Sequence, residues 1–263
     1  AALHLFGSPI GEVAVEAGHY RNAQLGLDLV LADDDLTGTL NGSHPVRLHR
    51  SEPLLTTPPT PVFPNGPAPV WTYRAGAALW ATPTVEGDLV CVGYEKGRLH
   101  ALRLADAKSV WTFDSGAPIY GAALITGDAV FVLNDEGRLA RLDRGTGAVR
   151  WQQDIGGGAV VRHLPAATEY SYDFVGPQPI LADSTLYLPT ADGAVVAIAA
   201  ATGDTRWRVV VGGLIRNTPL VTADRIVVGD WAGRITALAR TDGAKLWQVE
   251  TGAPITADPV RLG

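Results

Sequence analysis

Methionine is absent from this chain of 263 residues, cysteine occurs once, and no apolar run reaches the roughly 18 residues that mark a candidate transmembrane helix. A single cysteine excludes a disulfide within the chain. Cys91 lies in the apolar alternation DLVCVGY, so we expect it to be a small core residue. No basic segment followed by an apolar stretch marks a signal peptide. Because position 1 is not methionine, we expect a processed chain or a piece of a longer one.

Positive charge is also scarce. The chain has 21 lysines and arginines against 27 aspartates and glutamates, for a net charge of -6. Phosphate backbones are bound by a surplus of Lys and Arg on one surface, so this balance excludes a nucleic-acid partner. Hydrophobic residues make up 46% of the chain and charged residues 18%. This composition predicts a globular protein with a substantial core.

Tryptophan recurs at a regular interval. Trp71, Trp111, Trp151, Trp207 and Trp247 are separated by 40, 40, 56 and 40 residues. Internal periods of about 20 to 50 residues are typical of solenoids, propellers and arrays. With strand-like sequence between the tryptophans, a period near 40 predicts the blades of a β-propeller.

Each repeat divides into four strand-sized pieces, as in ATPTVEG, DLVCVGYEK, GRLHALRL and SVWTFD between residues 81 and 114. Apolar residues alternate, and Gly or Asp separates the pieces, which is typical of antiparallel strands with tight turns. We predict an all-β fold with four clear blades of four strands, and tryptophans packed between blades. The segments PVWTYRAG and TADPVRLG predict one further blade, shared between the two ends or incomplete.

The segments GRLHALRLADAKSVW, GRLARLDRGTGAVRW, GAVVAIAAATGDTRW and GRITALARTDGAKLW resemble the pyrroloquinoline-quinone-like (PQQ-like) repeat. The resemblance extends from about Val70 to Gly263 and implies a β-propeller. Some members of the family are quinone-dependent dehydrogenases, which carry two adjacent cysteines beside the quinone. Cys91 has no cysteine neighbour. We therefore expect no PQQ cofactor, and a quinone-dependent enzyme is the less favoured alternative.

Two interpretations of residues 1–51 are open. Residues 27–51 could supply strands of a divergent blade. Alternatively, the segment resembles the opening strand, helix and strand of type I periplasmic binding proteins, and we favour this interpretation slightly. The residues on the expected helical stripe are Tyr20, Ala23, Leu27, Val30 and Leu31.

A proline-rich stretch, PLLTTPPTPVFPNGPAP, follows this segment. Proline favours an extended backbone, so the stretch predicts a linker. The predicted organisation is an N-terminal segment over 1–51, a linker over 52–69 and a propeller over 70–263.

No catalytic or metal-binding motif is recognisable in the sequence. Asp33, Asp34 and Asp35 are consecutive, whereas a calcium loop alternates its ligands with spacers. The histidines, at positions 4, 19, 44, 49, 100 and 163, lack the spacing of zinc ligands. The nucleophile elbow GxSxG does not occur. We therefore expect neither an enzyme nor a metal site.

One end of the predicted propeller is the candidate binding face. In a four-stranded blade, the turn between the second and third strands lies at the same end as the connection to the next blade. The interval of 56 residues places 16 extra residues in one such connection, and loops of this kind often carry function. The candidate binding residues at this end are Trp80, Tyr94, Tyr120, Arg162, His163, Tyr170, Tyr172, Asp173, Arg216, Asp230 and Trp231.

These features predict a non-catalytic binding or scaffold propeller of the cell envelope, periplasmic or extracellular, with a protein partner or a small ligand. The family that the repeats resemble includes a propeller lipoprotein of the outer-membrane barrel assembly machinery, which implies a role in outer-membrane protein assembly. The alternative is the ligand-sensing domain of a receptor such as a membrane Ser/Thr kinase. The periplasmic-binder-like start and the proline-rich linker fit this alternative equally well.

Overall fold

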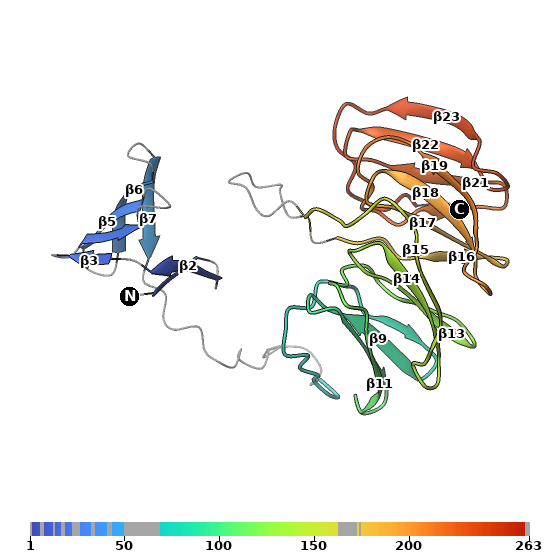
Figure 1. Cartoon of the computed structure of the whole chain (residues 1–263), viewed down its shortest axis with the longest axis horizontal. Coiled ribbons are helices and arrows are strands. Elements are labelled where there is room, and N and C mark those ends of the chain that lie inside the picture. Colours follow the sequence, from blue (N-terminus) through green and yellow to red (C-terminus); the bar gives the residue numbers. More distant parts are fainter. Residues whose placement is uncertain are drawn as a thin grey trace. The chain divides into compact units, whose positions relative to one another are not determined.

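The structure is a computed structural model. It describes seven strands between residues 2 and 49 and, farther along, residues 69–162, 173 and 175–260. The chain forms two compact units, Ala1–Ala68 and Pro69–Gly263, and Figure 1 draws both. The predicted linker over 52–69 lies outside the described residues except for its last position.

The first unit contains strands only in its described part. Strands β1 (Ala2–Leu5) and β2 (Ser8–Glu12) form an antiparallel pair. A second, five-stranded antiparallel sheet has the order β3-β4-β5-β6-β7. Its strands are β3 (Ala14–Glu16), β4 (His19–Asn22), β5 (Leu27–Ala32), β6 (Asp35–Leu40) and β7 (His44–His49).

The helix expected in this unit is wrong. Tyr20 lies in β4, and Leu27, Val30 and Leu31 lie in β5, where Leu29 pairs with Gly38 of β6. The segment LDLVLA satisfies the strand period as well as the helical one, because Leu27, Leu29 and Leu31 alternate with other residues. Pairing with β4 and β6 on its two sides gives the strand its backbone hydrogen bonds.

The second unit contains four antiparallel sheets of four strands each, which confirms the predicted all-β propeller fold. Blade 1 comprises β8 (Thr84–Glu86), β9 (Leu89–Gly93), β10 (Arg98–Arg103) and β11 (Ser109–Asp114). Blade 2 comprises β12 (Leu124–Ile125), β13 (Ala129–Leu133), β14 (Arg138–Asp143) and β15 (Val149–Asp154). Blade 3 comprises β16 (Ile180–Ala182), β17 (Thr185–Pro189), β18 (Ala194–Ala199) and β19 (Thr205–Val210). Blade 4 comprises β20 (Leu220–Val221), β21 (Arg225–Gly229), β22 (Arg234–Ala239) and β23 (Lys245–Glu250).

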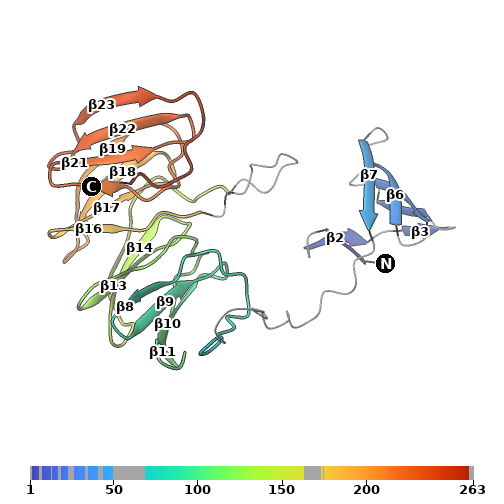
Figure 2. The ribbon, with the colours of Figure 1, turned by 180° about the vertical axis from the view of Figure 1, so that it is seen from behind.

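The blades follow one another in chain order through this unit, as Figures 1 and 2 show from opposite sides. Their hydrophobic core lies between successive sheets. One cluster joins Leu89 and Leu99 of blade 1 to Val130 and Leu142 of blade 2, and two equivalent clusters join blade 2 to blade 3 and blade 3 to blade 4. Cys91 lies in the first cluster and is fully buried, as expected. Burial raises the pKa of its thiol to about 12, which keeps it protonated and unreactive at neutral pH.

The repeating tryptophans connect each blade to the next. Four of the five indole N–H groups donate a hydrogen bond to the same turn of the blade that follows, between its third and fourth strands. The bonds are Trp71 Nε1 to Leu104 O at 2.7 Å, Trp111 Nε1 to Arg144 O at 2.8 Å, Trp151 Nε1 to Ala200 O at 3.1 Å and Trp207 Nε1 to Arg240 O at 3.3 Å. This recurrence confirms that the tryptophans lie at equivalent places between blades. Trp247, on the last blade, is 40% exposed.

Candidate binding face

The candidate residues come from two kinds of segment that meet at one end of the propeller. Among the described candidates, the turns after the second strand of each blade provide Tyr94, Asp230 and Trp231, and the segments that lead into the blades provide Trp80, Tyr120, Arg162, Asp173 and Arg216. Backbone hydrogen bonds hold the two kinds of segment together, for example Asp135 N to Pro118 O at 2.9 Å and Trp231 N to Leu214 O at 2.9 Å. We call this end the loop face.

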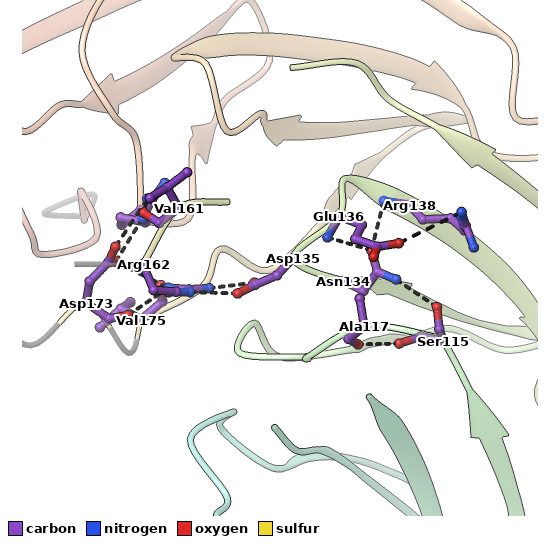
Figure 3. A network of polar contacts seen from close by, with 11 residues as sticks. Ser115, Ala117, Asn134, Asp135, Glu136, Arg138, Val161, Arg162, Asp173 and Val175 are labelled. Carbon is purple, nitrogen blue, oxygen red and sulfur yellow. Dashed lines mark hydrogen bonds and ion pairs between the residues drawn. The ribbon is translucent and has the colours of Figure 1, made fainter. Parts of the chain in front are cut away.

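Four charged residues on the loop face form a continuous ion-pair chain, which we call the clasp: Asp135, Arg162, Asp173 and Arg216 (Figure 3). Arg162 donates from Nε and Nη2 to the two carboxylate oxygens of Asp135, at 2.7 and 2.6 Å. Its Nη1 donates to Asp173 Oδ1 at 3.2 Å and to the carbonyl of Val175 at 2.6 Å. Arg216 approaches Asp173 from the other side, with Nε 2.9 Å from Oδ1 and Nη2 3.2 Å from Oδ2.

The clasp joins three parts of the propeller. Asp135 belongs to the turn after β13, Arg216 to the connection before β20, and Arg162 and Asp173 to the connection between blades 2 and 3. Asp173 is completely buried and Arg216 is 3% exposed at its side chain. Charges removed from water to this extent are stable only when they are paired. The clasp therefore fixes both described ends of the enlarged connection to blades 2 and 4.

Aromatic rings cover both guanidinium groups of the clasp. Arg162 Cζ lies 4.1 Å from the ring centroid of Tyr120, and Arg216 Cζ lies 5.8 Å from that of Trp231. Burial tends to lower the pKa of Arg162, but the hydrogen bond and charge of Asp135 outweigh it and raise the pKa. Burial, and then the charge of Asp135, raise the pKa of the Tyr120 hydroxyl. Both rings therefore take part in the packing of the clasp.

Two other candidate residues stabilise the turns that carry them. Asp230 accepts hydrogen bonds from Gly213 N at 3.0 Å, Arg234 N at 3.0 Å and Arg234 Nε at 2.9 Å. The Tyr94 hydroxyl lies 3.0 Å from His100 Nε2, and His100 Nδ1 is hydrogen-bonded to Tyr73. These contacts give the two side chains structural roles in blades 4 and 1.

The sequence placed these residues on one face but did not reveal their pairing. Arg162 and Asp173 flank the insertion with opposite charges, which is the one signal that could have indicated the clasp. His163, Tyr170 and Tyr172 lie outside the described residues. Exposed side chains near the clasp include two valines: Val161 is 76% exposed and Val175 is 49% exposed. Trp80, on the connection into blade 1, is 45% exposed.

Two hollows adjoin the clasp. A cavity of about 30 Å³ is lined by Asn134, Thr190, Arg162 and Arg216 among others, and it has room for water but not for a larger ligand. A hollow of about 310 Å³ is lined by Arg162, Tyr120 and Pro118 among others. Within the described residues, no group of three or more His, Cys, Asp or Glu side chains is placed to hold a metal ion. No described helix is long and apolar enough to span a membrane.

A family model described as the outer membrane protein assembly factor BamB matches residues 64–175 and 173–262. The chain belongs to this family of PQQ-like repeat β-propellers. The family assignment confirms the resemblance that the four repeated segments carry.

Solved structures show how widely this PQQ-like propeller fold is shared. BamB from Moraxella catarrhalis is 19% identical and aligns with a TM-score of 0.59, over 94% of this chain and 65% of its own. A quinohemoprotein alcohol dehydrogenase from Comamonas testosteroni is 17% identical, with a TM-score of 0.54 over 68% of this chain and 35% of its own. Since BamB and an alcohol dehydrogenase both match, at under 20% identity, these likenesses show the fold alone.

A curated protein matches part of this chain. The serine/threonine-protein kinase AfsK of Streptomyces griseus is 28% identical over 130 residues, which is 45% of this chain and 14% of the kinase. The chain thus spans 65% of the BamB structure and a small part of the kinase.

Proposed function

We propose that this propeller is a non-catalytic module of the cell envelope that binds a protein partner through its loop face. The observation that carries the proposal is the clasp. Its charged side chains bind one another, and the apolar Val161 and Val175, which lie next to or near clasp residues in the chain, are left exposed. Exposed apolar side chains on loops whose charged groups already pair with one another are suited to contact with another protein surface.

The described residues also support a binding role over catalysis. Cys91, the one cysteine, is buried and has a raised pKa, so it does not supply a thiolate nucleophile. The family model is described as an outer membrane protein assembly factor. By that relationship, assembly of outer-membrane proteins in the periplasm is the process in which we place the module.

A second function is favoured by one specific observation, the likeness to a serine/threonine-protein kinase over 130 residues. In this alternative the propeller is the extracytoplasmic sensing domain of a receptor, and the loop face binds the sensed ligand. The two functions predict different partners for the same face. An assembly factor binds another envelope protein, whereas a sensor binds a ligand without a stable protein partner.

The test uses paired variants of the full chain as bait in extracts of the cell envelope. Val161→Asp places a charge on the loop face, and Val149→Asp places one at the half-exposed start of β15. We expect Val161→Asp to lose the captured envelope protein and Val149→Asp to retain it. If both variants capture it equally, the binding site is not on the loop face. If the wild type captures no protein but is stabilised by a small molecule in a thermal shift screen, the sensor function replaces the proposed one.

The same preparation tests for quinone chemistry. We expect no dye-linked oxidation of alcohols or sugars above the protein-free rate after incubation with PQQ and calcium. A rate above that background, abolished by a chelator, would establish the enzyme alternative.

A further inference from the structure

The hollow of about 310 Å³ beside Arg162 is built from three segments that lie side by side on the loop face. The connection after β11 supplies Pro118 and Tyr120, and the turn after β13 supplies Asp135 and Glu136. The connection after β15 supplies Ala159, Val160 and Arg162. Pockets that hold small ligands measure about 300 to 1,000 Å³, so this hollow is at the lower limit. It has room for one extended side chain and little more.

Hydrogen bonds fix the walls of the hollow (Figure 3). Asn134 Nδ2 donates to Ser115 O at 2.8 Å, and Ser115 Oγ donates to Ala117 O at 2.7 Å. Asn134 Oδ1 accepts from the backbone N of Glu136 at 3.1 Å. On the opposite wall, Val160 N donates to Asp135 O at 2.5 Å. The hollow is therefore formed before any partner arrives, which lowers the entropic cost of binding.

The charges that line the hollow select against an anion. Arg162 is the single cation among the lining residues, and two carboxylates, those of Asp135 and Asp173, already pair with it. Glu136 also lines the hollow. Its side chain is 54% exposed, and its nearest cation, Arg138, is 4.0 Å away. The lining thus carries two carboxylates, those of Asp135 and Glu136, against one guanidinium, together with apolar surface from Pro118 and Val160.

We propose that this hollow receives a lysine or arginine side chain from the partner protein. The aliphatic stem would lie against Pro118, Ala117 and Val160, and the cationic head would reach Glu136. Such side chains commonly bury their stem on apolar surface while the charged end stays near water. The proposal rests on the proposed binding function and adds the chemistry of the partner: a basic residue on an extended segment.

The test uses a defined probe, the peptide acetyl-Ala-Ala-Arg-Ala-Ala-amide, added to the ¹⁵N-labelled full chain and followed by NMR. A matched peptide with citrulline in place of arginine has nearly the same shape but no charge. We expect saturable shifts at Ala117, Glu136 and Ala159 with the arginine peptide and weaker binding, by about two- to fivefold, with the citrulline peptide. Glu136→Gln should weaken binding by about two- to fivefold, the effect of one exposed ion pair.

Two control variants separate the hollow from general electrostatic attraction. Glu86→Gln removes an exposed carboxylate from β8 of blade 1 and should leave the peptide affinity unchanged. Ala159→Phe fills the hollow without changing any charge and should abolish the shifts. The proposal is overturned if both peptides give the same shifts, if Glu86→Gln and Glu136→Gln weaken binding equally, or if no shift occurs near the hollow.

These outcomes are distinguishable from failure of the proposed function. If Val161→Asp loses the envelope protein while the arginine peptide fails to bind, the loop face binds its partner by another site and only the hollow is wrongly assigned. If Val161→Asp keeps the envelope protein, the proposed function fails on this face whatever the peptide does.

Discussion

Asp173 is the residue on which the clasp depends most. It is completely buried and pairs with Arg162 and Arg216 at once. The substitution Asp173→Asn preserves the shape of the side chain but removes its charge. Arg216, 3% exposed, would then have no carboxylate partner: it would keep a neutral hydrogen bond to the amide oxygen at position 173, a 3.4 Å bond to Val161 O and the ring of Trp231. Removing one partner of a buried pair costs about 3 to 5 kcal/mol, because the other charge stays buried without compensation.

We expect this loss in the free energy of unfolding of the second unit, measured by urea denaturation at pH 7 with tryptophan fluorescence. The matched control is Asp128→Asn, which breaks the 2.7 Å pair with Arg141. Asp128 is 76% exposed, and such surface pairs contribute about 0 to 1 kcal/mol. Adding Arg216→Met to Asp173→Asn should recover part of the loss, since the uncompensated charge is then gone.

A loss below about 1 kcal/mol for Asp173→Asn would refute the assignment of the clasp as a buried ion-pair chain. An Arg216→Met change that adds its own full cost to that of Asp173→Asn would also refute it. Independent sites add in this way, whereas members of one network do not.

Three further predictions concern the propeller scaffold and are measured by the same denaturation assay. Trp111→Ala should cost about 3 to 5 kcal/mol, because the side chain is packed and hydrogen-bonded between blades 1 and 2. Trp247→Ala should cost less than about half of that, and equal losses would contradict the blade-contact assignment. Gly147→Ala should destabilise the propeller, because Gly147 has φ +71° and a Cβ there would lie 2.7 Å from the Trp111 ring. Ala107→Gly, at φ 54° in the equivalent turn of blade 1, should stabilise it by about 1 kcal/mol, and the opposite signs would refute the turn geometry. Burial, and then the charge of Arg98, lower the pKa of His100. The stability that the neutral ring contributes should therefore be present above its unfolded pKa of about 6.5 and be lost as the pH falls through the lower folded value. If His100→Gln loses as much stability as the wild type between neutral and acid pH, His100 is not the source.

The sequence predicted the propeller because every repeat carries several signals that agree. Strand alternation, Gly at the turns and a Trp at a fixed spacing all indicate the same four-stranded blade. The N-terminal segment lacks this agreement. In LDLVLA, the spacing of Leu27, Val30 and Leu31 fits a helix, and that of Leu27, Leu29 and Leu31 fits a strand equally well. Pairing with β4 and β6 decides between them, and pairing partners are not visible in a local pattern.

The candidate face could be predicted in location but not in its contacts. Blade geometry places Tyr120, Arg162 and Arg216 at one end because the connections between blades all lie there. Whether a charged residue faces a partner or a neighbouring loop depends on residues far away in the chain. Arg216 and Asp173 are separated by 43 positions, and no local spacing predicts that they meet. The polar residues that suggested a binding face therefore mostly pair with other residues of the same chain. The exposed valines beside them carry no signal in the sequence that marks them as site residues.

The clasp compensates for a break in the regular backbone pattern of the propeller. In two regular connections, a backbone N–H donates to the first residue of the preceding turn, from Ile119 to Tyr94 O at 3.3 Å and from Ile255 to Asp230 O at 3.0 Å. In the enlarged connection, Val160 N donates instead to Asp135 O, one residue farther along that turn. Here side chains add to the attachment, because the ion pairs of Arg162 and Asp173 anchor the two described ends. The attachment of this connection therefore depends on the paired charges of the clasp.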